Sequence, residues 1–347
     1  MREKGDVMSP WSLQVPEKKI SQHDACAMYT LLLRTRLFED EIYYICANQT
    51  PQHPFIVGKG YLSTGQEAIS VGCAYALAPD DWFAQSHRDM AAHFHRGLTF
   101  VEALYQYRCT TSSPTHGRDG NVHFAKEGTH MVGFTSHMGQ NVAVALGLAW
   151  AQRYRKTDRV ALATFGEGAA QQGIIHESMN YAATFQLPMI FVINNNRWAI
   201  SVPVQEQTSI EDLAIRGAAY HIPATVVDGN DTVAVYRAAT AAVALARAGR
   251  GPSLIECKTM RVMGHGTHDP ATYVPADEKT AWRARDPVVL LKRVLCERGW
   301  WSDERDTALR AEIRAELDTA VDVAGNDPPP DPRMAVQDVF STPVPVE

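Results

Sequence analysis

The chain has little of what marks a disulfide-bonded, zinc-binding or membrane protein. Its six cysteines among 347 residues lie far apart and form no Cys-x-x-Cys pair, which favours reduced thiols and a cytoplasmic location over a disulfide framework or a zinc site. No apolar stretch reaches the roughly 20 residues that a membrane-spanning helix needs. The charged first residues lack the apolar centre of a signal peptide.

Basic residues are also too few and too scattered for a nucleic-acid surface. The sequence has 33 Lys and Arg against 39 Asp and Glu, a formal net charge of −6, and no positive run that could follow a phosphate backbone. Hydrophobic residues make up 45% of the chain, an ordinary share for a globular protein. We therefore expect a soluble globular protein that binds neither nucleic acid nor a membrane.

Apolar runs alternate with helical patterns along most of the chain, which predicts an α/β fold with a parallel sheet and helices on both faces. The expected strands cover residues 82–85, 160–165, 189–194, 224–228 and 253–259. The expected helices cover residues 25–48, 65–77, 99–108, 136–154, 231–248, 286–299 and 304–324. Capping boxes that begin at Thr64 and Thr99, each with Glu three residues later, place two of the helix starts.

Three regions follow from this pattern. Residues 1–22 are polar and contain two prolines, so we expect an N-terminal arm. Residues 23–324 hold all the expected strands and helices and should form one domain. Residues 325–347 include four prolines between Asp327 and Pro332, which should end a helix and start an extended tail.

The most informative segment covers residues 160–201. An apolar run ends in Gly166-Glu167-Gly168, a helix-forming stretch begins at Ala169, and a second apolar run ends in Asn194-Asn195-Asn196. This order predicts a strand, a helix and a parallel strand, and the right-handed crossover of such a unit places the second strand beside the first. Glu167 and Asn196 should then meet at the carboxyl edge of the sheet, where open α/β folds bind ligands.

Two oxygen-bearing side chains at that edge suit a Mg²⁺ ion. Mg²⁺ prefers six oxygen ligands and is usually held by one or two carboxylates together with phosphates and water. One carboxylate and one amide leave the ion a net positive charge that can bind a diphosphate. Gly166 and Gly168 would let the backbone approach phosphate, and a helix N-terminus at Ala169 would present free N–H groups.

This segment resembles the thiamine-diphosphate motif, in which Gly-Asp-Gly is followed after a helix and a strand by an Asn pair. With the Ala199–Pro203 segment that follows, it is similar to the alpha subunit of the two-chain 2-oxo acid dehydrogenases, the pyruvate, branched-chain and acetoin enzymes. The resemblance runs from about Leu32 to Phe340 and implies the diphosphate-binding half of a thiamine-diphosphate fold. Glu167 replaces the commoner Asp, but Gly-Glu-Gly is similar to the branched-chain form.

The resemblance also implies roles for individual residues. Glu167, Asn196 and the carbonyl of Trp198 would bind Mg²⁺, where Trp198 replaces the usual Tyr. Arg88 would bind the diphosphate, beside His87 in place of a Tyr. His265 would reach the cofactor phosphate next to the reacting centre, where a histidine can transfer protons. The remaining cofactor contacts would be the backbone of Ser136 and Met138, at the aminopyrimidine ring, together with Gly166, Gly168 and Ala169.

Other residues leave alternatives open. Asn194 stands where an Arg or Glu is common, and Arg197 is a candidate substitute for that Arg. Some members bind K⁺ in the loop near Ser136, where Thr135, Gln140 and Asn141 offer oxygens that equally suit helix capping. Lys59, Tyr61 and Leu62 are candidates to line the substrate pocket, and the glycine-rich stretch 117–123 should form a loop near the cofactor.

Thiamine diphosphate serves as a carbanion source and an electron sink. The resemblance thus implies oxidative decarboxylation of a 2-oxo acid, with acyl transfer to a lipoyl-bearing acyltransferase. In this cofactor class a glutamate on a separate pyrimidine-binding domain activates the aminopyrimidine, and the sequence shows no second sheet domain of that kind. We therefore expect an obligate beta subunit, with the cofactor at the interface, in an α₂β₂ assembly.

The substrate is a finer question. The Gly-Glu-Gly triplet, the Gly299-Trp300-Trp301 segment and the proline run before Asp338-Val339-Phe340 look most like the branched-chain enzyme. Pyruvate, acetoin, or an acyloin or ketose in a transketolase-like reaction are alternatives. Trp300 and Trp301 also fit a plain packing role between the terminal helices.

Two other classes compete with this interpretation. A nicotinamide-binding Rossmann enzyme would need a third glycine where Gln171 stands and an acidic residue at the end of the next strand, and both are missing. A non-catalytic scaffold subunit that kept the fold is favoured by the departures at His87, Glu167 and Asn194. Arg88, Asn196 and His265 argue against it.

Gly266 stands where some members of the family that this chain resembles carry a regulatory serine. Because glycine has no hydroxyl to phosphorylate, we predict that a kinase of these complexes leaves the loop 261–269 without phosphate. Mass spectrometry of the loop peptide after incubation with kinase and ATP checks this, and a phosphorylated peptide would contradict it.

Overall fold

The computed structural model describes residues 11–17, 19–50 and 54–336. Six parallel strands form its central sheet in the order β2-β1-β3-β4-β8-β7. Their bounds are Met131–Val132 (β2), Trp82–Ala84 (β1), Ala161–Gly166 (β3), Met189–Asn195 (β4), Ser253–Lys258 (β8) and Ala224–Asp228 (β7). A separate antiparallel hairpin of β5 (Trp198–Ala199) and β6 (Val202–Pro203) follows β4.

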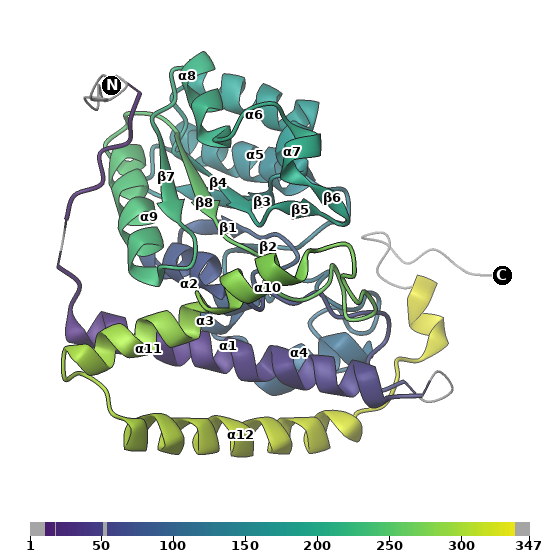
Figure 1. Cartoon of the computed structure of the whole chain (residues 1–347). Coiled ribbons are helices and arrows are strands. Elements are labelled where there is room, and N and C mark those ends of the chain that lie inside the picture. The colour runs from purple at the N-terminus through teal and green to yellow at the C-terminus, as the bar shows by residue number, and fades with distance from the viewer. Residues whose placement is uncertain (1–10, 18, 51–53, 337–347) are drawn as a thin grey trace.

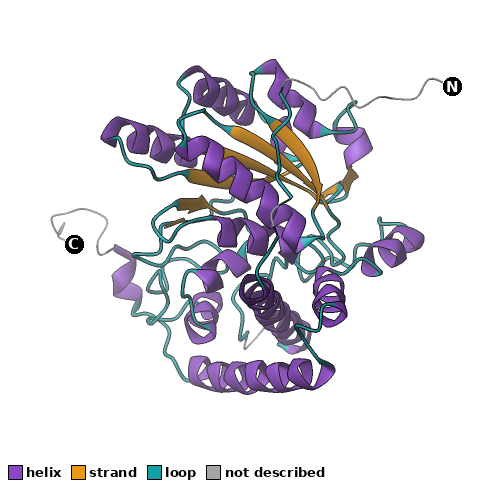
Figure 2. Cartoon of the chain, turned by 90° about the vertical axis from the view of Figure 1, so that its left-hand side faces the viewer, coloured by secondary structure: helices purple, strands orange, loops and turns teal. Residues whose placement is uncertain are grey.

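Helices cover both faces of this sheet (Figures 1 and 2). On one face, α5 (Gln140–Arg155) and α6 (Gly173–Thr184) pack against Ala161, Ala163 and Phe165 of β3. On the other face, α2 (Glu67–Ala76) and α9 (Thr232–Arg247) form a cluster with Leu162. Successive side chains of a strand point to opposite faces, so a strand between two helical layers is apolar at nearly every position.

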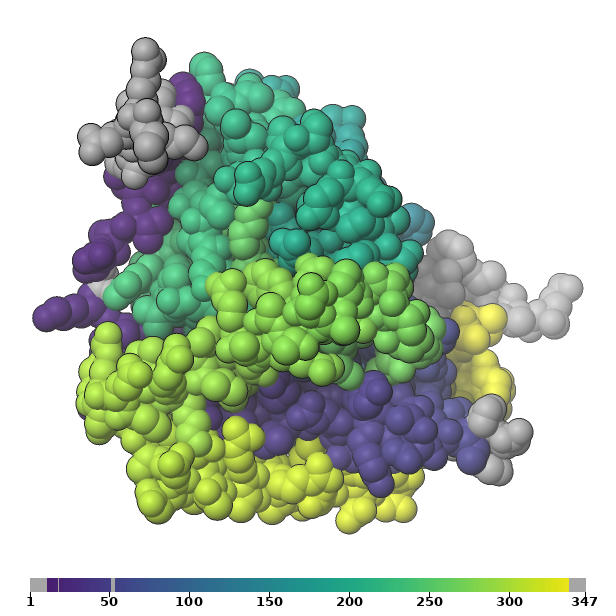
Figure 3. Space-filling view, viewed as in Figure 1, coloured from purple at the N-terminus to yellow at the C-terminus, as the bar shows by residue number. Residues whose placement is uncertain are grey.

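A second helical layer lies beyond α2 and packs around its own apolar cluster. Phe38 stands at its centre, with ring centroids 5.6 Å from Phe100 and 5.1 Å from Phe94. The space-filling view shows the segment with α10 and α11 crossing the surface between the sheet region and α1 (Figure 3). The helices of this layer are α1 (Gln22–Asn48), α3 (Met90–His95), α4 (Phe100–Arg108), α11 (Pro287–Glu297) and α12 (Asp303–Gly325).

Short helices complete the described fold. They are α7 (Val204–Gln207), α8 (Arg216–Ala219), α10 (Ala276–Arg283) and the 3₁₀ turns η1 (Ala169–Gln171), η2 (Leu213–Ile215) and η3 (Pro332–Val336). No described helix has the length and apolar character required to cross a membrane. All six cysteines are free thiols.

The described parts of the two terminal regions lie against the domain. In the predicted arm, Trp11 stacks on His221 with ring centroids 4.3 Å apart, and Ser12 bridges to Ala224 of β7. In the predicted tail, Pro328 accepts a backbone hydrogen bond from Thr111. Residues 1–10, 18 and 337–347, including the Asp338-Val339-Phe340 segment, lie outside the described residues. The boundaries at 22/23 and 324/325 stay predictions.

The α/β fold class and the five predicted strands are confirmed. The Thr99 capping box is confirmed as well, with both reciprocal bonds to Glu102 present. The sequence did not predict β2, β5 and β6, because two-residue strands carry no periodic pattern. Trp301 is buried against Tyr29 of α1, at 5.1 Å between ring centroids, which confirms its packing role.

Several details of the prediction are wrong. No Thr64 capping box forms, because α2 begins at Glu67 itself and the Glu67 carboxylate is buried in an ion pair with Arg36. The predicted helix at 136–154 begins only at Gln140, since Gly139 has φ +88°. At Ala169 a 3₁₀ turn stands in place of the expected α-helix, and α6 begins at Gly173. The tail contains the 3₁₀ turn η3 and is not extended throughout.

Substitution of two helix glycines, the buried Gly72 and the exposed Gly147, tests this packing. A Cβ added at Gly72 of α2 would lie 2.8 Å from the backbone nitrogen of Tyr236 in α9, so Gly72→Ala should destabilise the fold by about 1–3 kcal/mol. Gly147 of α5 has open space around it, so Gly147→Ala should stabilise the fold by up to about 1 kcal/mol. Urea unfolding of both variants measures this. A Gly72→Ala variant as stable as the parent would contradict the close α2–α9 packing.

Candidate functional site

Four neighbouring strands end at one edge of the sheet, and residues that follow each of them line one cavity of about 780 Å³. Arg88 follows β1, Glu167 follows β3, Asn196 follows β4, and His265 lies in the loop after β8. The two central strands β3 and β4 end close to the same level, since Gly166 pairs with Asn194. The cavity therefore stands at the carboxyl edge, where the sequence placed it.

The structure brings every residue that was predicted to contact the cofactor or the metal to this cavity, whereas Leu62, a candidate to line the substrate pocket, does not line it. Their contacts with a cofactor or metal stay predictions. The predicted residues in the lining are His87, Arg88, Ser136, Met138, Gly166, Glu167, Gly168, Ala169, Asn196, Trp198 and His265.

Glu167 is a buried carboxylate with weak partners. Within the described ranges its side chain accepts only two hydrogen bonds, both long, from the backbone N–H of Asn196 at 3.3 Å and from Gln207 Nε2 at 3.4 Å. Burial raises its pKa. The Asn196 side-chain oxygen accepts from the backbone N–H of Trp198 at 3.3 Å. A buried carboxylate without a cationic partner is costly, and a divalent cation beside Glu167 and Asn196 would compensate it.

The two glycines that flank Glu167 have different roles. A Cβ added at Gly166 would meet no atom within 4 Å, so Gly166 leaves open space at the cavity wall. A Cβ added at Gly168 would lie 2.6 Å from the Ala199 Cβ, so Gly168 is needed for the close approach of β5. Of the two glycines, only Gly166 leaves the space next to the backbone that was expected for a phosphate group.

Two buried arginines supply positive charge to the cavity. Arg88 donates to the carbonyls of Leu62 (2.5 Å) and His265 (2.7 Å). Arg261 donates to the carbonyls of Met263 and Ile200 and to the Tyr273 hydroxyl. Within the described residues, neither guanidinium forms an ion pair with a carboxylate. Burial lowers the pKa of both, and for Arg88 the charge of Arg261 adds to this.

This arrangement favours an anionic ligand. A buried guanidinium that bonds only neutral groups keeps an uncompensated charge, and the planar fork of arginine matches phosphate oxygens. The sequence-based prediction included Arg88 but not Arg261. The sequence signal that could have identified Arg261 is its position in the same segment as His265. The structure thus fits a diphosphate beside a divalent cation.

His265 is held by its own loop. Its backbone N–H donates to Asp269 Oδ2 at 2.6 Å, and its Nδ1 faces Arg88 Nη2 at 3.3 Å and Arg261 Nη1 at 3.5 Å. Burial, with the charges of Arg88 and Arg261, lowers its pKa to about 4. The ring is therefore neutral near pH 7. Because two donors face Nδ1, we assign the proton to Nε2.

His87 is partly buried, and its two ring nitrogens are shielded from solvent and have no hydrogen-bond partner among the described residues. Its ring lies 5.4 Å from that of Tyr61 and 5.5 Å from that of Phe134. Burial lowers its pKa well below the usual value, so it is neutral and has one donor and one acceptor. Buried polar groups are normally hydrogen-bonded, so these nitrogens are suited to a ligand.

Phe134 separates His87 from a second histidine, His123, whose ring stacks on Phe134 at 5.2 Å. His123 Nε2 lies 2.7 Å from Ser136 Oγ. His123 belongs to the predicted glycine-rich loop and lines the cavity, as do Lys59 and Tyr61. Phe134, Gln172 and Ile200 also line it, although the sequence analysis assigned none of them a role there.

The structure decides two questions that the sequence left open, the roles of Asn141 and Arg197. Asn141 is no helix cap, because its amide nitrogen donates to the carbonyls of Ala84, Gln85 and Thr164 and so ties the ends of β1 and β3 together. A K⁺ site in this loop stays a prediction. Arg197 does not line the cavity, since its side chain pairs with Glu278 at 2.6 Å, so it does not replace the missing Arg at position 194.

The sheet-edge cavity, with its two buried arginines and its buried carboxylate, is suited to a phosphate-bearing ligand in an α/β protein. Comparison with known proteins is more specific. The model of the family "Dehydrogenase E1 component" matches residues 46–333. The chain therefore belongs to the dehydrogenase E1 component family, as an alpha subunit of the 2-oxo acid dehydrogenase type. This family uses thiamine diphosphate, and its alpha subunits work with a beta subunit.

Relatives of two specificities match over most of the chain. It is 34% identical to the pyruvate dehydrogenase E1 component subunit alpha of Rhizobium meliloti (strain 1021), over 93% of this chain and 91% of that protein. It is 33% identical to the 2-oxoisovalerate dehydrogenase subunit alpha of Bacillus subtilis (strain 168), over 93% and 97%. It is 34% identical to the mitochondrial human 2-oxoisovalerate dehydrogenase subunit alpha, over 80% and 62%.

The neutral His265 predicts a pH effect on stability. An unfolded histidine takes up a proton near pH 6.5, whereas burial lowers the pKa of folded His265 to about 4. Between these values the unfolded state binds more protons, so this residue makes the fold less stable as the pH falls from about 6.5 toward 4. His265→Gln removes the effect. The free energy of unfolding of this variant, measured with urea, should therefore rise relative to that of the parent as the pH falls from about 7.5 to about 5. A difference in free energy that stays constant over this range would contradict the assignment.

Proposed function

We propose that the chain is the alpha subunit of a thiamine-diphosphate- and Mg²⁺-dependent dehydrogenase that oxidatively decarboxylates a branched-chain 2-oxo acid and transfers the acyl group to a lipoyl carrier. The observation that carries this proposal is the pairing of uncompensated charges in one cavity. Among the described residues, Arg88 and Arg261 form no ion pair with a carboxylate, and Glu167 forms none with a cationic side chain. A diphosphate with its divalent ion compensates both.

Each group in the cavity has a task in this proposal. Arg88, Arg261 and the neutral His87 hydrogen-bond the diphosphate, and Glu167 and Asn196 bind Mg²⁺ together with the Trp198 carbonyl. The backbone of Ser136 and Met138 holds the aminopyrimidine. Bound thiamine diphosphate supplies a carbanion and an electron sink. His265, neutral and with its proton on Nε2, donates a hydrogen bond or a proton beside the reacting centre.

The proposal includes a beta subunit. The described residues hold one large parallel sheet, which is fully used by the diphosphate-binding half. We propose that the glutamate that activates the aminopyrimidine comes from the beta subunit. We propose an α₂β₂ assembly in the cytoplasm with the cavity at the α–β interface.

Branched-chain substrates are the finer part of the proposal. The Gly166-Glu167-Gly168 triplet and the proline-rich end of the chain support them. Relatives named for pyruvate and for 2-oxoisovalerate match at nearly equal identity, 34% and 33%. A substrate panel must therefore include both acids.

The chain, purified with its beta subunit, should oxidise 3-methyl-2-oxobutanoate faster than pyruvate when thiamine diphosphate, Mg²⁺ and an electron acceptor are present. Titration should show binding of thiamine diphosphate with Mg²⁺ and none of NAD.

Glu167→Ala should lower activity by on the order of 100-fold or more, since it removes a metal ligand and not merely an outer-shell group. Glu177→Ala, at an exposed position of α6, is the matched control and should retain activity.

Faster turnover of pyruvate would contradict the substrate assignment alone. An intact α–β complex that binds no thiamine diphosphate would contradict the enzyme assignment and favour a non-catalytic subunit.

A further inference from the structure

We infer that Glu39 is a positioning residue for Arg88, which it holds in place through the peptide group between Leu62 and Ser63. This inference rests on the proposed function, because it assigns Arg88 to the cofactor diphosphate. Glu39 lies in α1, lines no part of the cavity and belongs to none of the sequence motifs.

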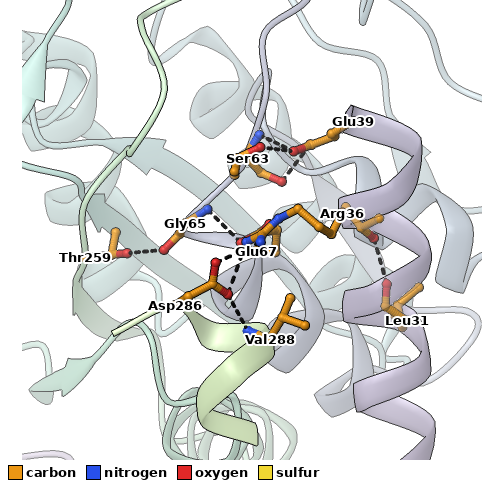
Figure 4. A network of polar contacts seen from close by, with 11 residues as sticks. Leu31, Arg36, Glu39, Ser63, Gly65, Glu67, Thr259, Asp286 and Val288 are labelled. Atoms are coloured by element: carbon orange, nitrogen blue, oxygen red, sulfur yellow. Dashed lines mark hydrogen bonds and ion pairs between the residues drawn. The ribbon is translucent and has the colours of Figure 1, made fainter. Parts of the chain in front are cut away.

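The Glu39 carboxyl group is fully engaged by one loop. It is 2% exposed and accepts hydrogen bonds from the backbone N–H of Ser63 at 2.8 Å and from the Ser63 hydroxyl at 2.7 Å. The Thr64 hydroxyl adds a third bond at 3.3 Å. Figure 4 shows the Glu39 side chain pointing from α1 at this loop. All three donors lie 24 or 25 residues further along the chain, so the contact is tertiary and not local.

Arg88 holds the same peptide group from its other side. Arg88 Nη1 donates to the Leu62 carbonyl at 2.5 Å. The Leu62 C=O and the Ser63 N–H belong to one planar peptide unit, so a rotation of this unit would break the bonds to Arg88 and to Glu39 together. The second anchor of Arg88 is the His265 carbonyl at 2.7 Å. The direction of the guanidinium is thus fixed by two carbonyls, one of them oriented by Glu39.

A neighbouring ion-pair network fixes the end of this loop (Figure 4). Arg36 bridges Glu67 at 2.5 Å and Asp286 at 2.8 Å, and Glu67 accepts from the Gly65 N–H at 2.8 Å. This network holds Gly65 but makes no bond to the Leu62–Ser63 peptide. The orientation of that peptide therefore depends on Glu39.

The chemistry of Glu39 suggests a conservative rescue. Unlike Glu67, Glu39 has no ion-pair partner among the described residues. Burial, with the nearby Glu67 carboxylate, raises its pKa, which favours the protonated form. A glutamine presents one acceptor and one donor, as a protonated carboxyl does. It can accept from the Ser63 N–H and donate to the Ser63 hydroxyl oxygen.

The test compares three variants of the full chain, each purified with its beta subunit. Isothermal titration calorimetry with thiamine diphosphate plus Mg²⁺, and separately with inorganic pyrophosphate plus Mg²⁺, gives the affinity well below the unfolding temperature. Glu39→Ala should weaken both affinities by about 10-fold or more, in the range for groups that orient first-shell ligands. Glu39→Gln should stay within about 3-fold of the parent, since it keeps the bond to the Ser63 N–H.

Tyr29→Phe is the control for stability alone. Tyr29 also lies on α1, and its buried hydroxyl donates to Asp306 at 2.5 Å, away from the loop. This variant should lower the melting temperature and leave both affinities unchanged.

The outcomes separate the possibilities. If the parent binds and Glu39→Ala binds equally well, or if Tyr29→Phe weakens binding as much as Glu39→Ala does, the positioning role is overturned and the proposed function stands. If the parent binds neither probe, the proposed function falls, and the inference falls with it.

Discussion

The site depends on charges that are buried without an ion-pair partner among the described residues. In the part of the chain that the structure describes, Arg88 and Arg261 hydrogen-bond only to neutral groups, and Glu167 accepts only two long hydrogen bonds. Desolvated charges of this kind destabilise a fold unless a ligand compensates them. The cavity is therefore best understood as part of a protein–ligand unit, in which an anion and a cation enter together. A diphosphate carried on a divalent ion has that composition.

The fold delivers these groups by simple means and supports them from behind. The ends of β1, β3, β4 and β8 are adjacent in a parallel sheet, so residues far apart in the sequence reach one edge. Asn141 ties two of these strand ends together, and Glu39 fixes the loop that Arg88 contacts. The rigid sheet sets the positions of the ligating residues, and buried hydrogen bonds from the helical layers set their orientation.

Local patterns in the sequence predict the sheet and the centre of the site well. Glu167 and Asn196 could be placed because both stand within three residues of the end of an apolar run, and the crossover rule brings such positions together. Glu67 was assigned wrongly to a capping box because its actual partner, Arg36, comes from another helix and no local rule contains it. Phe134 was missed for the same reason, since only the tertiary fold brings its loop to the cavity. The start of α6 at Gly173 depends on the extended backbone of Gln172, which composition does not reveal.

The central claim is that Glu167 and Asn196 hold a divalent ion that anchors a diphosphate between Arg88 and Arg261. Crystals of the α–β complex grown with thiamine diphosphate and Mn²⁺, with diffraction data collected at the manganese absorption edge, test it most directly. The account predicts an anomalous peak bonded to the side-chain oxygens of Glu167 and Asn196, with diphosphate density against Arg88 and Arg261. An anomalous peak elsewhere, or bound cofactor with the Glu167 carboxylate turned away from the ion, would contradict it.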